Sequence, residues 1–404
     1  MRTTRKRTPR IRRLSRRTAP FQESVIREMT RLHAEVGGVN LAQGLPDFDP
    51  PPALSNALAE AIRRSENHQY GFTWGLPAFR EAIAEKTRRV NGIASDPETE
   101  ITVTCGVSEA VASAVLGLTE PGDEAIVLEP WYENYVPACR LAGVVPKFVS
   151  LTRPDFRLDP AALARAMTPR TRIVFVNTPA NPSGRVFSQA ELSEIARLCQ
   201  LHGVIAVTDE IYEHIWFDGH RHVSLGSLSG MEDRTVTLSG LGKTYAVTGW
   251  RVGWAVAAAP LTALVRKVHD YLTICAPTAF QDAGRVALAL PESYYEDLRR
   301  AYARRRAILL DALRAAGFAF ATPEGAYYVM VDGAPLGWKD DWELVDFLAR
   351  RVGVTAVPGS SFYASRGGGG GRSQIRVNFA KTEATLREAA RRLTGRSLRA
   401  PRKT

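Results

Sequence analysis

The chain has 404 residues, of which 45% are hydrophobic and 24% are charged, with a formal net charge of +11. This length predicts about two to three domains with a large core, and the composition excludes disordered and fibrous classes. The apolar runs are too short to span a bilayer, so we do not predict a membrane protein.

The positive charge is concentrated at the two ends of the chain. Residues 1–20 contain nine Lys and Arg residues and residues 393–404 contain four more, without acidic residues. The remaining segment, residues 21–392, contains 40 of the 53 basic residues and all 42 acidic residues, so its net charge is close to zero. We predict disordered, solvated tails and no nucleic-acid partner. An RNA-attracting arm and an organellar presequence are the alternatives for the N-terminal tail.

Four cysteines are far apart and form no CxxC pair. Each lies in or beside an apolar segment, so we predict buried, reduced thiols and a cytoplasmic location. They are Cys105, Cys139, Cys199 and Cys275.

The N-terminal segments predict helices separated by loops. Helices are expected over 21–36, 53–64 and 79–90. Gly44 lies in a turn where the backbone could touch a small ligand, with a plain turn as the alternative. Tyr70 lies in an aromatic loop.

Short apolar strands alternate with helices from residue 101 to 258. Strands without polar alternation, separated by helices, indicate a mostly parallel sheet between two helical layers, in which ligands bind at the carboxyl ends of the strands. The predicted strands are 101–104, 125–128, 173–176, 204–208, 235–238 and 252–256, and the helices between them include 108–118, 132–141, 160–167 and 188–202.

Polar and glycine residues directly follow several of these strands. Gly106 opens a turn into a helix that begins near Ser108, which suits a phosphate. Asn181, Asp209 and Lys243 follow three other strands. Each has an ordinary structural explanation as a cap, turn or core residue, but their shared position predicts one site.

Lys243 lies among small and apolar residues, eight positions before Arg251. Desolvation favours the neutral amine, which is the form that adds to an aldehyde. Arg251 offers a planar, charged fork for a phosphate. The pair predicts a phosphorylated aldehyde cofactor such as pyridoxal 5'-phosphate. A surface lysine and an ordinary arginine ion pair are the alternative.

The C-terminal part predicts a smaller α+β unit. Arg376 lies on a strand between apolar neighbours, so it needs an anion, either an acidic side chain or a substrate carboxylate. The expected elements are one or two helices in 284–315, a turn and strand in 317–332, a helix over 341–352, a strand over 354–357, a flexible glycine run at 367–371, a strand over 373–380 and a helix over 383–393.

Five motifs together resemble the class I and II aminotransferases of pyridoxal-phosphate fold type I. They are Lys-Thr-Tyr-Ala-Val-Thr-Gly-Trp-Arg-Val-Gly within 239–253, Asn-Pro-Ser-Gly at 181–184, Asp-Glu-Ile-Tyr at 209–212, Gln-Gly-Leu-Pro-Asp-Phe at 43–48 and Ile-Arg-Val-Asn-Phe-Ala at 375–380. The resemblance covers about residues 22–392. It implies an α/β fold with a large domain and a smaller α+β domain. The predicted divisions are a tail at 1–20, an arm at 21–50 joining the small domain, a large cofactor domain at 51–290, a small domain at 291–392 and a tail at 393–404.

The resemblance implies catalytic roles for three residues. Lys243 forms the Schiff base with the cofactor and moves the proton, Asp209 pairs with the pyridine nitrogen, and Tyr212 bonds the phenolic oxygen. Further cofactor contacts are implied for Asn181, Tyr132, Gly106, Val107, Ser108, Arg251, Ser239 and, from the neighbouring subunit of a homodimer, Tyr70. Substrate contacts are implied for Arg376, Gly44, Asn181 and Tyr132.

The implied activity is transfer of an amino group between an α-amino acid and a 2-oxo acid by a ping-pong mechanism. Ser108 stands where some relatives for acidic substrates have a lysine, and no second basic residue for a side-chain carboxylate is evident, which favours neutral or aromatic substrates. Aromatic residues that could line the pocket are Tyr70, Trp74, Trp131, Tyr132, Tyr327 and Phe362, of which about half are expected in core or dimer packing. A C–S β-lyase on the same scaffold, or a non-enzymatic ligand sensor, is the alternative. No metal is predicted.

Overall fold

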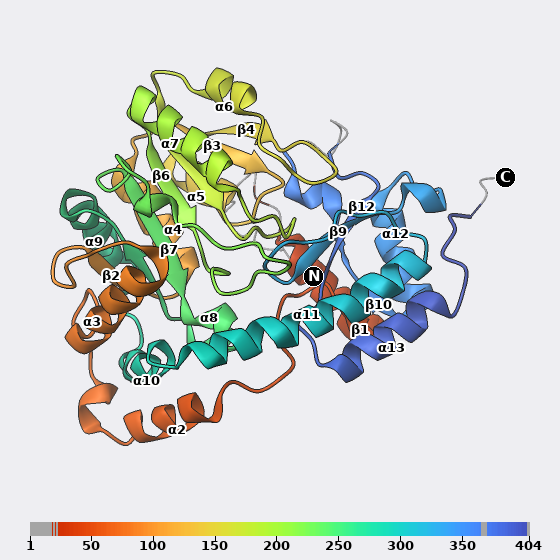
Figure 1. Ribbon diagram of the computed structural model, residues 1–404, viewed down its shortest axis with the longest axis horizontal. Helices are drawn as coiled ribbons and strands as arrows, with labels where there is room; N and C mark the ends of the chain where they lie inside the picture. Colours follow the sequence, from red (N-terminus) through yellow and green to blue (C-terminus); the bar gives the residue numbers. More distant parts are fainter. Residues whose placement is uncertain (1–17, 19–20, 22, 365–369, 402–404) are drawn as a thin grey trace, which may run out of the picture.

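The computed structural model describes residues 18, 21, 23–364 and 370–401. A seven-stranded sheet with its covering helices forms one part, and the N-terminal helix joins the C-terminal elements in the other (Figure 1). Figure 1 shows helix α11 (Glu292–Ala315, teal) running from beside α10 (Thr278–Leu288) toward the C-terminal elements. In the described part of the chain, no helix has the length and apolarity that crossing a membrane requires.

The large sheet has the strand order β2-β8-β7-β6-β5-β3-β4. Only β8 runs against its neighbours, and the other pairs are parallel. The strands are β2 (Ile101–Thr104), β3 (Glu124–Glu129), β4 (Val145–Ser150), β5 (Thr171–Asn177), β6 (Ile205–Asp209), β7 (Thr235–Gly240) and β8 (Gly253–Val256). The prediction of a mostly parallel α/β sheet is therefore confirmed.

Both faces of this sheet are buried because alternate side chains enter two different cores. On β5, Val174 and Val176 pack in one core with Leu192 of helix α7. Ile173 and Phe175 pack in the other core, with helices α4 (Val107–Leu118), α5 (Tyr135–Ala142) and α9 (Ala259–Thr273). A strand that is buried on both sides reads as a continuous apolar run, which is the pattern the sequence carries.

Local signals explain where several helices begin. Ser188 caps α7, and Glu191 completes the capping box by bonding back to it. The side chains of Asp159 and Thr382 cap α6 and α13 by accepting a backbone N–H, without a capping box. The helices of the large part are α2 (Pro52–Ala61), α3 (Pro77–Lys86), α4 (Val107–Leu118), α5 (Tyr135–Ala142), α6 (Pro160–Ala166), α7 (Gln189–His202), α8 (Leu241–Thr244), α9 (Ala259–Thr273) and α10 (Thr278–Leu288).

The remaining elements form two small sheets with four helices. Strands β11-β12-β9 make an antiparallel sheet, and β1 pairs with β10 in parallel, so the N-terminal segment joins the C-terminal elements. The strands are β1 (Val39–Asn40), β9 (Tyr328–Asp332), β10 (Val354–Thr355), β11 (Val357–Pro358) and β12 (Gln374–Asn378), and the helices are α1 (Val25–Val36), α11 (Glu292–Ala315), α12 (Asp341–Phe347) and α13 (Glu383–Thr394).

Some elements differ from the sequence predictions. Strand β4 was not predicted because it lies at the sheet edge, is only partly buried, and contains Pro146 and Lys147. Helix α9 was also missed. The expected helical region 284–315 starts earlier and is two helices, α10 and α11, separated at Pro291. The expected strand 354–357 is two strands, β10 and β11, which belong to different sheets.

The C-terminal tail is packed as far as Ala400, which corrects the prediction of a solvated tail over 393–404. Leu398 is buried, and its carbonyl accepts a hydrogen bond from Trp338 Nε1 at 2.8 Å. Residues 1–17, 19–20 and 402–404 of the predicted tails, and most of the glycine run, lie outside the described residues. All four cysteines are free thiols, but Cys105 and Cys275 are only partly buried, contrary to the prediction.

Candidate active site

One cavity of about 500 Å³ lies at the carboxyl ends of the parallel strands. It is lined by both parts of the fold, so its walls come from distant segments of the chain. Its predicted lining residues are Gly44, Gly106, Val107, Ser108, Tyr132, Asn181, Asp209, Tyr212, Lys243, Arg251 and Arg376. Those not predicted include Ser24, Ile26, Arg27, Glu133, Asn134, Asn177 and Tyr328.

The strand register explains why Asn177, Asp209 and Lys243 converge. Asn177 ends β5 opposite Asp209, which ends β6, and Asp209 lies opposite Leu238 of β7. Strand β7 then leads into the short helix α8 that carries Lys243. The parallel order thus brings an amide, a carboxylate and an amine to one edge of the sheet.

Asp209 is a buried carboxylate of the cavity wall with few partners. Burial raises its pKa to about 6, against the opposing effect of the hydrogen bond from Tyr135. Tyr135 Oη donates to Asp209 Oδ2 at 2.8 Å, and the Ile211 backbone N–H donates to Oδ1 at 3.3 Å. Tyr135 stacks on Phe175, which fixes its ring in the sheet's core. A buried carboxylate of this kind suits a cationic N–H partner.

The turn from β2 into α4 forms an anion cradle with Arg251. Arg251 Nη2 donates to the Cys105 carbonyl at 3.2 Å, and Nη1 donates to the Thr248 carbonyl at 3.2 Å. Both partners are neutral, so in the described residues the guanidinium has no carboxylate partner. A Cβ at Gly106 would lie 2.3 Å from Arg251 Nη2. Glycine therefore lets the arginine approach the first turn of α4, where free N–H groups also favour a phosphate.

Ser108 and Tyr132 are connected through Asn134. The Asn134 side-chain amide donates to Ser108 Oγ at 2.8 Å and to Tyr132 Oη at 3.3 Å. Asn134 was not predicted, because its contact with Ser108 joins residues 26 positions apart that share no sequence motif. The contact positions an aromatic ring next to the phosphate cradle.

Arg376 is 1% exposed, yet no acidic side chain of the described residues pairs with it. Its Nη1 donates to Asn181 Oδ1 at 2.8 Å and its Nη2 donates to the Ala42 carbonyl at 2.7 Å, while Nε has no partner. The predicted alternative of a structural ion pair is therefore not what the fold contains. A buried cation with neutral partners suits a ligand carboxylate.

Tyr212 and Gly44 lie around Tyr328 at the second wall of the cavity. Tyr212 Oη donates to Tyr328 Oη at 3.3 Å, and Tyr327 Oη donates to the Gly44 carbonyl at 3.0 Å. A Cβ at Gly44 would overlap Tyr328 Oη at 1.9 Å. Glycine at position 44 is thus required for the N-terminal segment to pass this close.

Two predicted site residues lie outside this cavity. Ser239 is buried, and its hydroxyl donates to Glu213 Oε1 at 2.6 Å. It therefore does not line the cavity in which the implied cofactor contact would be made. Tyr70 is 79% exposed and does not reach its own cavity, so it could act only on a neighbouring subunit.

Of the other aromatic residues proposed to line the pocket, Trp74, Trp131, Tyr327 and Phe362 do not line it either. Trp131 stacks on Phe148, and Trp74 lies under Arg266. Tyr328 takes the place expected for Tyr327.

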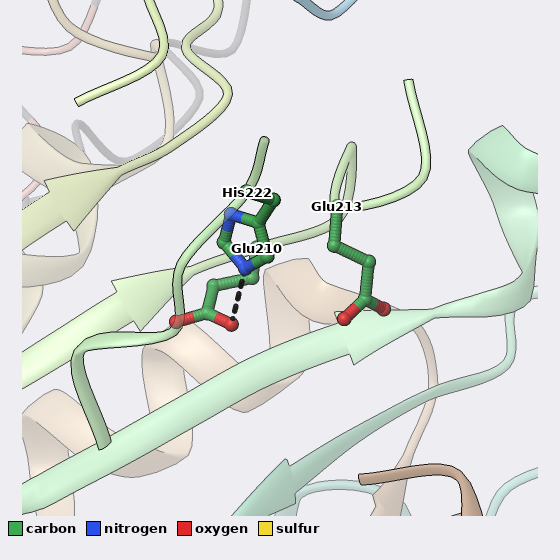
Figure 2. Close-up of side chains that lie close together, drawn as sticks. All are labelled: Glu210, Glu213 and His222. Carbon is green, nitrogen blue, oxygen red and sulfur yellow. Dashed lines mark hydrogen bonds and ion pairs between the residues drawn. The ribbon is translucent and has the colours of Figure 1, made fainter. Parts of the chain in front are cut away.

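A buried polar cluster lies behind Asp209. Figure 2 shows Glu210 bonded to His222, with the Glu213 carboxylate beside them; Glu210 Oε2 and His222 Nε2 are 2.9 Å apart. Lys86 Nζ lies 2.5 Å from Glu213 Oε1. Burial opposes ionisation of Glu213, but Lys86 lowers its pKa to about 2. Because Lys86 already supplies the cation, the cluster is explained as an ion-pair network that supports the strand end.

The cavity fits the predicted cofactor on three observations. Arg251 and the α4 N-terminus form a cradle with no acidic partner, Asp209 is a buried carboxylate beside it, and Lys243 lines the same space. Phosphate, ring nitrogen and aldehyde each have a matching group.

Comparisons with known proteins agree with this chemistry. A profile described as "Aminotransferase class I and II" matches residues 36–393. A probable N-succinyldiaminopimelate aminotransferase of Mycobacterium tuberculosis is 41% identical over 94% of this chain and 97% of its own length. The methionine aminotransferase of Escherichia coli is 39% identical over 92% and 95%. The solved structure of the M. tuberculosis N-succinyldiaminopimelate aminotransferase covers 95% of this chain and 100% of its own, at 40% identity and a TM-score of 0.92.

The match spans most of the chain, and the fold and cavity agree with it. The chain belongs to the class I and II aminotransferases and is a transaminase that depends on pyridoxal 5'-phosphate.

Proposed function

We propose that this enzyme moves the amino group of a neutral or aromatic α-amino acid to a 2-oxo acid by a ping-pong mechanism. The observation that carries the proposal is the single cavity shared by Lys243, Asp209 and Arg376. In the first half-reaction the donor leaves as its 2-oxo acid and its nitrogen stays with the enzyme. In the second half-reaction the acceptor takes this nitrogen and leaves as an amino acid. Bound pyridoxal phosphate supplies an electron sink for the carbanion.

The chain's own residues have distinct tasks in this proposal. Arg376 holds the α-carboxylate, with Asn181 and the backbone near Gly44 beside it. Asp209 keeps a proton on the ring nitrogen, and Arg251 with the first turn of α4 holds the phosphate. Lys243 would hold the cofactor through its amine, and the same amine would move the proton at the substrate Cα.

The preference for neutral or aromatic donors rests on three other residues that line the cavity. Ser108 is a neutral residue whose hydroxyl is held by Asn134, and Tyr132 and Ile26 offer apolar surface. The relative named for methionine acts on a neutral amino acid, which supports the same preference here.

We further propose a homodimer with shared sites in the cytoplasm. Tyr70 is exposed and outside its own cavity, as a residue that serves a neighbouring site would be. The four free thiols fit a reducing compartment.

The test is the visible spectrum of the purified enzyme with a panel of amino acids and no oxo acid. We expect a cofactor band in the region of about 400 nm that fades with the preferred donor while its 2-oxo acid appears in equal amount. Lys243→Ala should abolish the response, whereas Lys267→Ala, at an exposed lysine of α9, should keep it. A band that persists with every amino acid would contradict the proposal. Pyruvate and ammonia formed from a cysteine conjugate would instead support the β-lyase.

A further inference from the structure

A third arginine lies in the wall of the catalytic cavity. Arg27 is in the first turn of α1, next to Ser24, whose hydroxyl accepts its backbone N–H at 3.4 Å. Ser24, Ile26 and Arg27 line the same cavity as Arg376 and Lys243. The side chain of Arg27 is exposed, whereas Arg376 is 1% exposed, so one guanidinium lies deep and the other lies toward solvent.

Arg27 forms no ion pair in the described residues, although its charge, with the larger effect of Arg31, helps to lower the pKa of Glu23. The matched comparison is Arg31, one turn further along the same helix, which forms an ion pair with Glu23 outside this cavity. Glu133 lines the cavity too, but it accepts the Ser24 hydroxyl at 2.7 Å and forms no ion pair with Arg27. Arg27 therefore contributes to the lining of the substrate space without an ion pair that occupies its guanidinium donors.

We propose that Arg27 is a specificity-determining residue that binds the second carboxylate of a dicarboxylic 2-oxo acid, the amino acceptor. The inference rests on the proposed function, because it takes Arg376 as the partner of the α-carboxylate. A ligand with two carboxylates then joins the deep guanidinium to the outer one. The neutral donor uses the same cavity without this contact, since Ile26 and Tyr132 offer apolar surface.

Glu133 sharpens the expected selectivity. Arg27 and Glu133 contribute opposite charges to the lining of the same cavity, so neutral side chains and a carboxylate in contact with the guanidinium are both accepted. Without Arg27, the Glu133 carboxylate remains and repels a second anion. Loss of Arg27 should therefore act on dicarboxylic acceptors and much less on monocarboxylic ones.

The experiment measures kcat/KM of the holoenzyme for 2-oxoglutarate and for pyruvate with one neutral donor. In Arg27→Gln, the ratio of the two values should fall about tenfold, the size expected for a charge-assisted contact at an open site. Arg27→Lys should retain part of the ratio. Arg31→Gln removes the same charge from the same helix and should leave the ratio as in the wild type.

The outcomes separate this inference from the proposed function. Equal losses for both acceptors, an unchanged ratio, or a wild-type enzyme that uses pyruvate but no dicarboxylic acid would overturn the role of Arg27 alone. Absence of amino transfer to either acceptor would instead contradict the proposed function. A melting temperature of Arg27→Gln close to that of Arg31→Gln would show that the fold is retained.

Discussion

At the scale of single residues, the site depends on side chains whose surroundings change their chemistry. Asp209 is buried to the extent that its pKa rises to about 6, and Tyr135 and the Ile211 N–H partly offset this. Arg251 and Arg376 have neutral hydrogen-bond partners, which leaves their charge for a ligand. The sequence indicates which residue types are present, but the charge balance of each group comes from its partners.

Gly106 provides a test at this scale. Gly106→Ala should weaken pyridoxal-phosphate binding about tenfold or more, because the added Cβ would lie 2.3 Å from Arg251 Nη2 and would displace the phosphate-binding guanidinium. The measurement is a spectroscopic titration of cofactor-free protein. Gly219→Ala is the matched control, since Gly219 has a similar positive φ of +80° but nothing within 4 Å of the added Cβ. Similar losses in both variants would mean that backbone strain, and not the clash with Arg251, is the cause.

At the scale of elements, helices α4 and α9 are joined beneath the phosphate cradle. His269 of α9 lies with Nδ1 2.5 Å from Glu109 Oε1 and Nε2 2.7 Å from the Thr73 carbonyl. Both ring nitrogens face acceptors, so the geometry suits an imidazolium. Burial alone would lower the pKa of His269, but the Glu109 carboxylate, with a smaller effect of Asp270, raises it. Burial alone would raise the pKa of Glu109, but His269, the Cys105 N–H and Thr273 lower it.

The pair should stabilise the fold in a defined pH window. The contribution of Glu109 is complete above its unfolded pKa and is lost as the pH falls through the lowered folded value. The contribution of His269 is complete below its unfolded pKa and is lost as the pH rises through the raised folded value. The window therefore lies between about pH 4.3 and about pH 6.5.

Glu109→Gln tests this window. The variant should lose about 3 kcal/mol of stability inside the window and less on either side, because it leaves a buried histidine without its anion. The measurement is the melting temperature of cofactor-free protein across this pH range. Glu194→Gln, at a surface pair with Arg197, should cost less than about 1 kcal/mol at every pH. A difference between wild type and Glu109→Gln that does not vary with pH would contradict an ionised pair.

At the scale of the whole molecule, exposed apolar side chains gather near the loop that carries Tyr70. Tyr70, Phe72 and Tyr271 are 79%, 64% and 92% exposed. The contact between His269 and the Thr73 carbonyl brings this loop against α9, so these residues belong to one region of the surface. An exposed apolar region of this kind is typical of a surface that another chain covers, which supports the proposed homodimer.

Subunit mixing tests whether the sites are shared. Lys243→Ala should be inactive, and Tyr70→Ala should bind the cofactor about tenfold more weakly, because the proposed partner contact is lost. After the two variants are mixed in equal amounts and allowed to exchange, half of the dimers should be mixed, and each mixed dimer has one intact site. About a quarter of all sites in the mixture should then have normal cofactor affinity and activity. Activity equal to the sum of the separate variants would contradict sharing. Sedimentation of each variant checks that dimers remain.

The sequence by itself determined the mostly parallel sheet and the placement of Gly106, Asn181, Asp209 and Lys243 at one edge of it. Apolar runs buried on both faces form parallel strands, and the carboxyl ends of such strands meet whatever the details of packing. The local sequence pattern is therefore sufficient to predict that these residues lie at the same edge of the sheet. It also identified Arg376 as a buried cation in need of an anion.

The tertiary structure alone decided which long-range partners meet. Ser24 reaches Glu133 across 109 positions, which places Arg27 in the cavity wall, and Tyr135 reaches Asp209 across 74. The family resemblance implied a cofactor contact for Ser239, but its hydroxyl donates to Glu213. Such contacts depend on how separate elements pack, and neither local propensity nor periodicity contains that information, because the two side chains of each pair lie on segments that are unrelated until the core forms.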